Sequence, residues 1–247
     1  MISAVIRPPS IHRTPRRLAQ ALGVRTMKYP SRDPERNWPV LGLYLTYPTP
    51  EERNIEDDGE YESCYHFFSM PKPEQRRQLE RADIPVPVTL TERYIAAYWP
   101  RGRWIVRPIR HQQGRHYRVT DDPVDFHEGR EYISEVFPKE REYRIIYVLG
   151  NPLIILRKKP GPDCGPEDAW NHTNGSYFQT LNEPGKLHRT DIFEKLQGFP
   201  VIQNAQLVGV DVLWRNGEYR VLEFNSCPSL SIDDNLDTVV QYIRDNS

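Results

Sequence analysis

Short apolar segments follow one another from residue 103 onward, and they predict a succession of β-strands. In the longest of them, Tyr143, Ile145, Tyr147 and Leu149 share one face, which places Glu142 and Arg144 together on the other face. The predicted strands are 103–109, 117–119, 131–137 and a hairpin over 141–159 that turns at Gly150-Asn151.

Helix signals are scattered among these strands. Thr14, Pro15 and Gly23 suit the cap, the first position and the end of a helix. A buried strand is expected over 39–47, and further helices over 73–81, 91–98, 191–197 and 234–244. Because helices and strands are mixed without strict alternation, the pattern predicts an α+β fold rather than a doubly wound sheet.

A second hairpin, GVDVLWRNGEYRVLEFNSCPSL (209–230), carries acids and an amide in strands whose other residues are apolar. The dipeptide Asn216-Gly217 marks its turn. A two-residue turn there would place Asp211 opposite Leu222 and would send Glu223 to the other face of the sheet.

A three-residue loop with Gly217 at positive φ, followed by a bulge, is the other arrangement. It would pair Trp214 with Glu218 and put Asp211 on the same face as Val221, Glu223 and Asn225. We expect this arrangement, because it brings together two carboxylates and an amide oxygen, which are hard ligands that suit Mg²⁺. A half-exposed hairpin that turns its polar residues toward water is the alternative.

Composition narrows the classes of partner. Lys and Arg total 33 against 34 Asp and Glu, so no overall positive field favours a nucleic acid. No segment approaches the roughly 20 apolar residues that span a bilayer. Cys64, Cys164 and Cys227 have no metal-ligand spacing and are expected to be reduced thiols. We therefore expect a soluble, cytoplasmic protein without a nucleic-acid or membrane partner.

Four stretches in sequence order together resemble the ATP-grasp superfamily over about residues 82–230. IPVP (84–87) is similar to the segment that leads into the nucleotide lobe, and WIVRPIRHQQGRHYRV (104–119) to a strand, a phosphate-covering loop and a return strand. YISEVFPKEREYRIIYVLG (132–150) resembles the adenine hinge and the strand with the ribose-binding acid. The hairpin 209–230 resembles the metal-binding hairpin, whose pattern is Asp, then Glu-x-Asn followed closely by Pro.

The resemblance implies a role for each matching residue. Arg107 stands where the superfamily usually has a phosphate-binding lysine, and the covering loop has only one glycine, Gly114, so both positions depart from the pattern. The implied roles are Mg²⁺ binding by Asp211, Glu223 and Asn225, adenine binding by Glu135, Val136 and Phe137, ribose binding by Glu142, and phosphate contact and catalysis by Arg107. Beyond the resemblance, Lys158 or Lys159 is a further candidate for phosphate contact, and we expect Arg144 and Asn174 to be catalytic residues that hold the acid substrate.

The implied fold has two α+β lobes with ATP between them, formed by residues 81–134 and 135–247 and preceded by a short α/β domain over 1–80. The implied activity joins a small-molecule or peptide carboxylate to an amine through an acyl phosphate, with ATP and Mg²⁺. The compact, proline-rich form is also similar to small ligases encoded by bacteriophages. A phosphotransferase on the same scaffold, or a nucleotide-binding or structural protein without ligase chemistry, remains an alternative, and the departures at Arg107 and in the one-glycine loop favour the latter.

Overall fold

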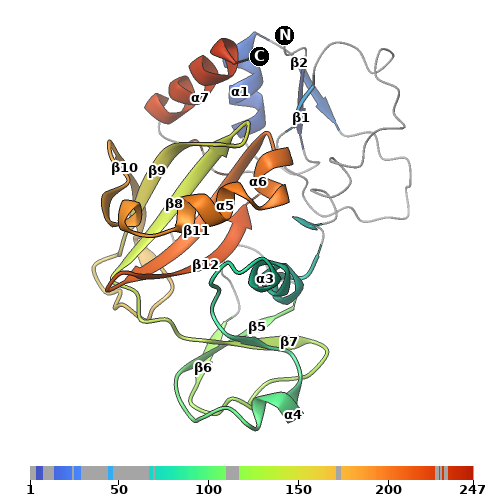
Figure 1. The fold of residues 1–247 in the computed structure, drawn as a ribbon, viewed down its shortest axis with the longest axis vertical. Coiled ribbons are helices and arrows are strands. Elements are labelled where there is room, and N and C mark those ends of the chain that lie inside the picture. The colour runs from blue at the N-terminus through green and yellow to red at the C-terminus, as the bar shows by residue number, and fades with distance from the viewer. Residues whose placement is uncertain are drawn as a thin grey trace.

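The computed structural model describes residues 4–7, 14–23, 25–28, 44–46, 67–68, 70–109, 117–170, 174–225, 228, 230 and 233–246 of the 247-residue chain. Within these ranges the strands form three sheets, with helices interspersed among them along the chain (Figure 1). The α+β class predicted from the sequence is confirmed. None of the helices in the described ranges is long and apolar enough to cross a membrane.

The largest sheet has five antiparallel strands in the order β10-β9-β8-β11-β12. Strand β12 therefore lies at one edge, beside β11, and β8 lies in the middle. The strands are β8 (Arg141–Val148), β9 (Asn151–Lys159), β10 (Tyr177–Leu181), β11 (Leu207–Arg215) and β12 (Glu218–Asn225).

One face of this sheet packs against helices that follow β10 and precede β8. Tyr143, Ile145 and Tyr147 are fully buried there, as the alternation along β8 predicted. The prediction was wrong for Leu149, which lies in the turn after β8 and packs against the apolar cluster of the opposite face. Leu196 and Ile202 from the covering helices join the same core. The elements on this face are α3 (Lys72–Arg81), the 3₁₀ helix η3 (Gly185–Arg189), α5 (Ile192–Gln197) and α6 (Pro200–Asn204).

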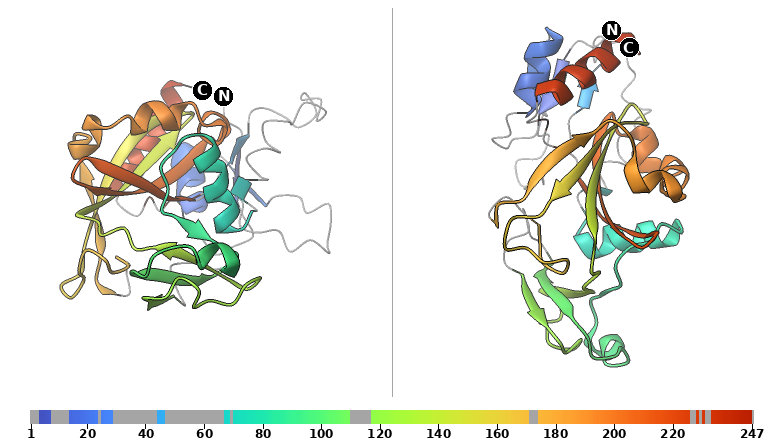
Figure 2. Two further views of the ribbon diagram at one scale, coloured as in Figure 1. Left: turned by 60° about the horizontal axis from the view of Figure 1, so that its bottom comes forward. Right: turned by 90° about the vertical axis from the view of Figure 1, so that its left-hand side faces the viewer.

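The opposite face is covered by α1 (Thr14–Leu22) and α7 (Asp233–Asp245), which lie side by side at one end of the molecule (Figures 1 and 2). Their apolar residues pack on Ile146 and Val148 of β8. Glu142 and Arg144 lie on the same face of β8 but outside that apolar cluster. The polar end of this face is where the candidate site forms.

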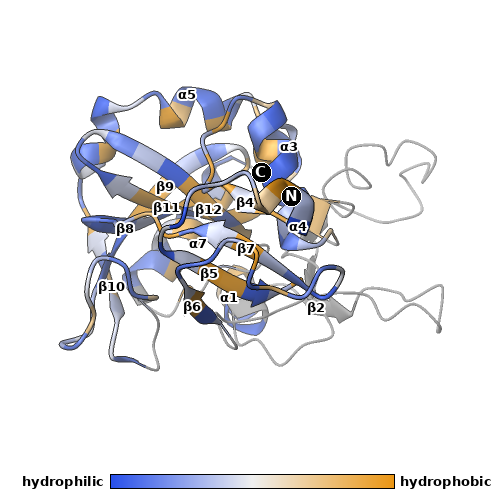
Figure 3. Ribbon diagram, turned by 90° about the horizontal axis from the view of Figure 1, so that it is seen from below, coloured by the Kyte–Doolittle hydropathy of each residue, from blue (hydrophilic) through white to orange (hydrophobic). Residues whose placement is uncertain are grey.

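A second, four-stranded sheet has the order β4-β7-β5-β6 and its own apolar core. Trp104, Val106 and Ile133 are buried in that core. Figure 3 views the molecule from the end at which this sheet lies. Its elements are β4 (Thr89–Leu90), the short helix α4 (Arg93–Ala96), β5 (Trp104–Pro108), β6 (Arg118–Thr120) and β7 (Glu131–Glu135).

A third sheet, β2-β1-β3, forms near the start of the chain. Strand β1 (Ala4–Arg7) pairs parallel with β2 (Arg25–Lys28) and antiparallel with β3 (Tyr44–Thr46). The strand expected over 39–47 is thus present at residues 44–46, and the rest of it lies outside the described residues. Helix α1 lies between the two parallel strands in the sequence, as the crossover connection of a parallel pair requires.

Two sequence expectations shift by a few residues. The hairpin of β8 and β9 turns at Leu149-Gly150, both at positive φ (50° and 78°), one residue earlier than expected. Helix α4 is shorter than the expected 91–98, and its N-cap is Glu92 rather than Thr91. Because Pro100 disfavours a helical residue before it, the helix ends before Trp99.

The turn between β11 and β12 gives a stability prediction. Gly217 has a φ of 91°, where a side chain is strained, whereas Gly102 lies at ordinary φ with only the Trp104 Nε1 atom near its missing Cβ, at 3.9 Å. Gly217→Ala should lower the free energy of unfolding by about 1 kcal/mol. Gly102→Ala should change it by less than about 0.5 kcal/mol, both measured by urea unfolding. Equal effects at the two positions would contradict the backbone assignment.

Candidate functional site

The hairpin of β11 and β12 contains one extra residue. Its two-residue turn, Asn216-Gly217, sets Arg215 opposite Glu218, and the ladder continues regularly to Val212 opposite Val221. The next pair is Asp211 with Glu223, so the register shifts by one residue. Leu222 is therefore the extra residue of a β-bulge.

The expectation of a three-residue loop was wrong, because Trp214 pairs with Tyr219 rather than with Glu218. The expectation that Val221 shares the face of Asp211 was also wrong, since Val221 pairs with Val212 and is buried in the core on the other face. The expectation that Asp211, Glu223 and Asn225 share one face is confirmed. The bulge at Leu222, rather than a three-residue loop, shifts the register that brings them together. Asp211 lies opposite Glu223, and Asn225, opposite Gly209, lies on the same face. The two carboxylates and the amide are brought together on the polar end of the sheet.

Asp211 is the most heavily bonded of the three. Its carboxylate accepts from Arg144 Nε (2.6 Å) and Nη2 (2.8 Å) and from Asn225 Nδ2 (3.1 Å). Both members of the ion pair are buried, with side chains 13% (Arg144) and 4% (Asp211) exposed. Burial alone lowers the pKa of Arg144, but the charge and hydrogen bonds of Asp211 outweigh it, so that the pKa is raised. Arg144 is thereby held charged beside the candidate ligands.

Gly209 makes room for this arrangement. A Cβ at this position would lie 2.9 Å from Pro228 Cβ and 3.4 Å from Arg144 Cδ. The absence of a side chain therefore lets Pro228 come close to β11, next to Arg144 and Asn225. The Pro that follows the Glu-x-Asn pattern in sequence is thus in contact with the site.

Helix α3 adds a cation that the sequence analysis missed. Lys72 Nζ lies 3.6 Å from Glu223 Oε2 and donates to the Phe224 carbonyl at 3.3 Å. A helix was expected here, but a lysine in its first turn has no local pattern that marks it as facing β12. Only the packing of α3 on the sheet edge places it beside Glu223.

Glu142, on the same face of β8 as Arg144, forms its ion pairs with two lysines. It forms ion pairs with Lys158 at 2.6 Å and with Lys139 at 3.6 Å. Lys139 was also missed; it is 6% exposed, donates to the Asp168 carbonyl at 2.6 Å and lies over the Trp170 ring at 4.8 Å. Burial lowers the pKa of Lys139, Glu142 opposes this, and the charges of Lys158 and Arg107 lower it further.

Arg107 reaches the same region from the four-stranded sheet. It is 9% exposed, and its Nε is buried without a hydrogen-bond partner among the described residues. Its guanidinium lies 5.9 Å from the centroid of the Tyr117 ring. Because its charge contributes to lowering the pKa of Lys139, it is electrostatically part of the cluster around Glu142. A buried guanidinium with an unused donor suits an anionic ligand.

The hinge expected to hold adenine links the two sheets. Glu135 ends β7, and the Val136 N–H donates to the Arg103 carbonyl at 3.0 Å. Arg220 of β12 lies 4.0 Å from the Glu135 carboxylate and 5.3 Å from the centroid of the Phe137 ring. The hinge is therefore fixed to the same hairpin that carries Asp211 and Glu223.

Asn174 is placed differently from the rest. Its Nδ2 donates to the Ala169 carbonyl, and its Oδ1 accepts from Ser176 at 3.1 Å. These contacts hold it within the loop that precedes β10.

The donor set fits a hard cation. Among the described residues there is no group of three or more His, Cys, Asp or Glu that could hold a metal ion by itself. Two carboxylates and one amide, as in Asp211, Glu223 and Asn225, are a partial oxygen shell of the kind that Mg²⁺ completes with water and phosphate oxygens. The types of donor atom therefore fit a hard cation such as Mg²⁺.

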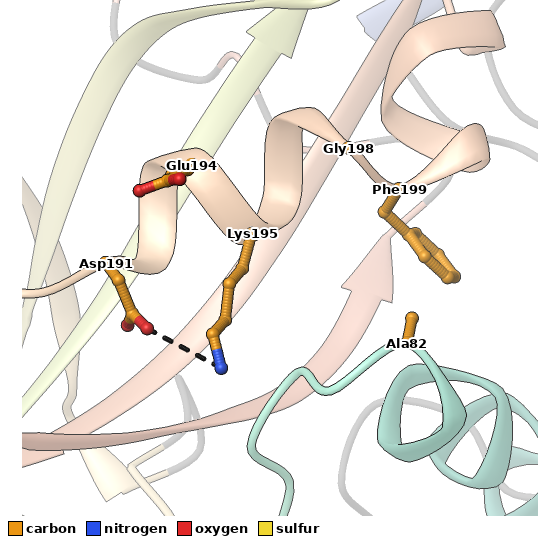
Figure 4. A pocket seen from close by; sticks show the side chains of 6 residues that line it. All are labelled: Ala82, Asp191, Glu194, Lys195, Gly198 and Phe199. Carbon is orange, nitrogen blue, oxygen red and sulfur yellow. Dashed lines mark ion pairs between the residues drawn. The ribbon is translucent and has the colours of Figure 1, made fainter.

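A cavity of about 350 Å³ lies elsewhere (Figure 4). It is bounded by Ala82, Asp191, Glu194, Lys195, Gly198 and Phe199. Lys195 is held there by Asp83 at 2.6 Å and by Asp191 at 3.5 Å. Helix α5 covers the sheet face opposite to the polar cluster, so this cavity contains none of the predicted site residues.

No protein-family model and no curated protein matches the chain. Solved structures do match. ATP-grasp ligase PsnB complexed with minimal precursor is similar at a TM-score of 0.58 and 14% identity, covering 100% of this chain and 99% of that one. Macrocyclase MdnC bound with precursor peptide MdnA, from Microcystis aeruginosa MRC, is similar at a TM-score of 0.58 and 13% identity, and the match covers 100% of both chains. D-alanine–D-alanine ligase from Bacillus anthracis is similar at a TM-score of 0.56 and 12% identity, and the match covers 100% of this chain and 99% of that one. At these identities the likeness shows the fold.

The buried Arg144–Asp211 pair gives a second prediction. Asp211→Ala should lower the free energy of unfolding by about 3 kcal/mol, because it leaves Arg144 buried without its partner. Adding Arg144→Met should recover part of that loss, since no charge is then left uncompensated. Urea unfolding of both single variants and the double variant measures this coupling. Strictly additive losses would show that the two side chains do not act as a pair.

Proposed function

We propose that this chain, whose fold is that of the ATP-grasp ligases, is an ATP-dependent ligase that joins a carboxylate to an amine. One observation carries the proposal: a bulge turns Asp211, Glu223 and Asn225 to one face of the sheet, beside the cations Arg144 and Lys72. An oxygen-ligand site surrounded by buried cations suits a metal bound to polyphosphate.

The cluster around Glu142 supports a polyphosphate ligand. Lys139 and Lys158 pair with the Glu142 carboxylate, and the charge of Arg107 acts on Lys139; all three cations are largely buried. Excess buried positive charge is costly unless an anion compensates it. We assign the phosphate contacts to Arg107 and Lys158, as expected from the sequence, and add Lys72, because it lies beside Glu223.

The remaining contacts to the nucleotide are assigned to the hinge between β7 and β8 and to the start of β8. We assign adenine to Glu135, Val136 and Phe137, and the ribose hydroxyls to Glu142. Lys139 and Lys158 already donate toward Glu142, but a carboxylate accepts up to about four hydrogen bonds, so acceptor capacity remains for a ribose. This site lies between the lobes that we assign to residues 81–134 and 135–247, with residues 1–80 as the preceding domain.

The reaction has two balanced steps. An oxygen of the substrate carboxylate attacks the γ-phosphorus of ATP and displaces ADP, which gives an acyl phosphate. The amine then attacks the acyl carbon, phosphate leaves with the C–O bonding pair, and the amine loses a proton to give the amide. The first step is needed because a free carboxylate is a poor electrophile. Bound Mg²⁺ would supply charge neutralisation at the transferring phosphoryl group, held by Asp211, Glu223 and Asn225.

The chain's own residues position these groups. Arg144 uses Nε and Nη2 on Asp211, and we assign its Nη1 to the substrate carboxylate. Asn174 is our second candidate for that contact, although its amide is bonded within its own loop, so it would have to exchange those bonds. Arg107 and Lys158 stabilise the negative charge that is redistributed as the phosphoryl group moves.

The substrate class is a carboxylate on a small molecule or a peptide. PsnB and MdnC were solved with precursor peptides, and PsnB also with Mg and ADP. These ligands are properties of those proteins, and their relation to this chain is part of the proposal. ATP and Mg²⁺ are the cofactors that the oxygen ligands and the buried cations favour.

The proposal predicts an interceptable acyl phosphate. With ATP, Mg²⁺ and a pool of candidate acids, hydroxylamine should give a hydroxamate in step with ADP. Glu223→Gln should lower both rates by at least about 100-fold, because it removes one of the two carboxylates that hold the metal. Glu218→Gln is the matched control: Glu218 is on the same strand, but its side chain is 72% exposed, and both rates should stay within about twofold.

The two alternatives give different results in the same assay. ADP formed together with a stable phosphorylated hydroxyl product, and without hydroxamate, would show a phosphotransferase. Nucleotide binding without ADP formation across a broad library of acids and amines would contradict ligase chemistry. Equal loss of activity in Glu218→Gln and Glu223→Gln would contradict the assignment of Glu223.

A further inference from the structure

Helix α3 is almost entirely polar, yet part of it is buried. Its sequence is KPEQRRQLER, and Gln75 and Arg76 are each only 4% exposed. A buried guanidinium is costly unless its donors are used. The partners of Arg76 therefore indicate why an arginine is present in this helix.

Arg76 connects both large sheets. Its Nε donates to the Leu222 carbonyl of β12 at 3.3 Å, and its Nη1 donates to Thr89 Oγ1 of β4 at 2.8 Å. The guanidinium also lies 5.7 Å from the centroid of the Tyr132 ring of β7. One side chain from α3 thus contacts the bulged hairpin and two strands of the four-stranded sheet.

The acceptor on β12 is the residue that makes the bulge. Leu222 is the extra residue between the pairs Asp211–Glu223 and Val212–Val221. Since β12 is an edge strand, groups there that do not pair with β11 need partners outside the sheet. The Val221 N–H donates to the Pro85 carbonyl at 2.7 Å, and the Leu222 carbonyl accepts from Arg76.

The charge of Arg76 is also coupled to the site. Burial lowers the pKa of Arg76, Tyr132 and Glu223 raise it, and the charge of Arg107 lowers it. Arg76 thus lies near enough to Glu223 and Arg107 for their charges to act on it. Its hydrogen bonds to Leu222 and Thr89 hold the strands beside the candidate metal ligands.

We propose that Arg76 is a positioning residue for the metal pair: by holding the Leu222 carbonyl it fixes the bulge that turns Glu223 to the face of Asp211. This inference rests on the proposed function, since it needs Asp211 and Glu223 to bind a metal. It does not give Arg76 a contact with substrate. Its effect is on the register of β12, and through the register on the affinity for the metal.

The test is Mn²⁺ binding in the presence of ADP, measured by electron paramagnetic resonance, with ADP binding measured separately without metal. Arg76→Lys keeps the charge but cannot reach two acceptors with a planar fork. It should weaken Mn²⁺ binding at least tenfold while metal-free ADP binding stays within about twofold. Arg77→Lys is the control: Arg77 is the next residue and its side chain is 42% exposed, so both affinities should be unchanged.

Deletion of Leu222 provides a rescue. Without the extra residue, a regular ladder places Glu223 opposite Asp211, because Val212 already pairs with Val221. In that background Arg76→Lys should no longer change Mn²⁺ affinity. A tenfold loss that persists in the deletion background would show that Arg76 acts on the metal in another way and would overturn the inference.

A second arm leaves α3 unchanged. Thr89→Val removes the Nη1 partner of Arg76 and should weaken Mn²⁺ binding about threefold, so the question is answered even where replacement of Arg76 unfolds the chain. Unchanged Mn²⁺ affinity in both Arg76→Lys and Thr89→Val, or equal losses of Mn²⁺ and metal-free ADP binding, would overturn the inference alone. A parent protein that binds ADP but no Mn²⁺ would overturn the metal assignment and the inference together.

Discussion

The site depends on one extra residue in an edge strand. Without Leu222 as a bulge, the turn at Asn216-Gly217 would place Glu223 on the apolar face of the sheet, away from Asp211. With the bulge, Val221 and Phe224 are buried in the same core although they are three residues apart. Glu223, which lies between them in the sequence, turns to the polar face. The bulge therefore serves packing on one side of the sheet and the convergence of oxygen ligands on the other.

Charge organises the polar end of the sheet around that hairpin. Asp211 is neutralised by Arg144, Glu223 lies near Lys72, and Glu142 is paired with two lysines. The cations come from α3, the hinge and the central strands, so the cluster forms only when those elements are packed together. Its four cations, Lys72, Lys139, Arg144 and Lys158, outnumber the three carboxylates, and Arg107 adds a fifth, which is the electrostatic basis for proposing a polyphosphate ligand.

Sequence reasoning reached the α+β class, the long hairpin and the shared face of Asp211, Glu223 and Asn225, because alternation and turn residues are local signals. It predicted the extra residue in the turn. Val221 and Phe224 are apolar residues three positions apart, and this spacing was a signal for a bulge further along the strand. Lys72, Arg76 and Lys139 could not be found, since their roles follow from the docking of α3 and of the hinge. Buried charge in a polar helix is decided by tertiary contacts that no periodicity records.

The central claim is that the bulged hairpin holds the metal of a bound nucleotide. A crystal structure of the parent protein with Mn²⁺ and a non-hydrolysable ATP analogue tests it most directly, because the anomalous signal locates the metal independently of the phosphates. The account predicts a peak at ligand distance, about 2.0–2.3 Å, from both the Asp211 and Glu223 carboxylates, with the phosphates beside Arg107. An analogue bound with its metal away from both carboxylates, or with its phosphates away from Arg107, would contradict it.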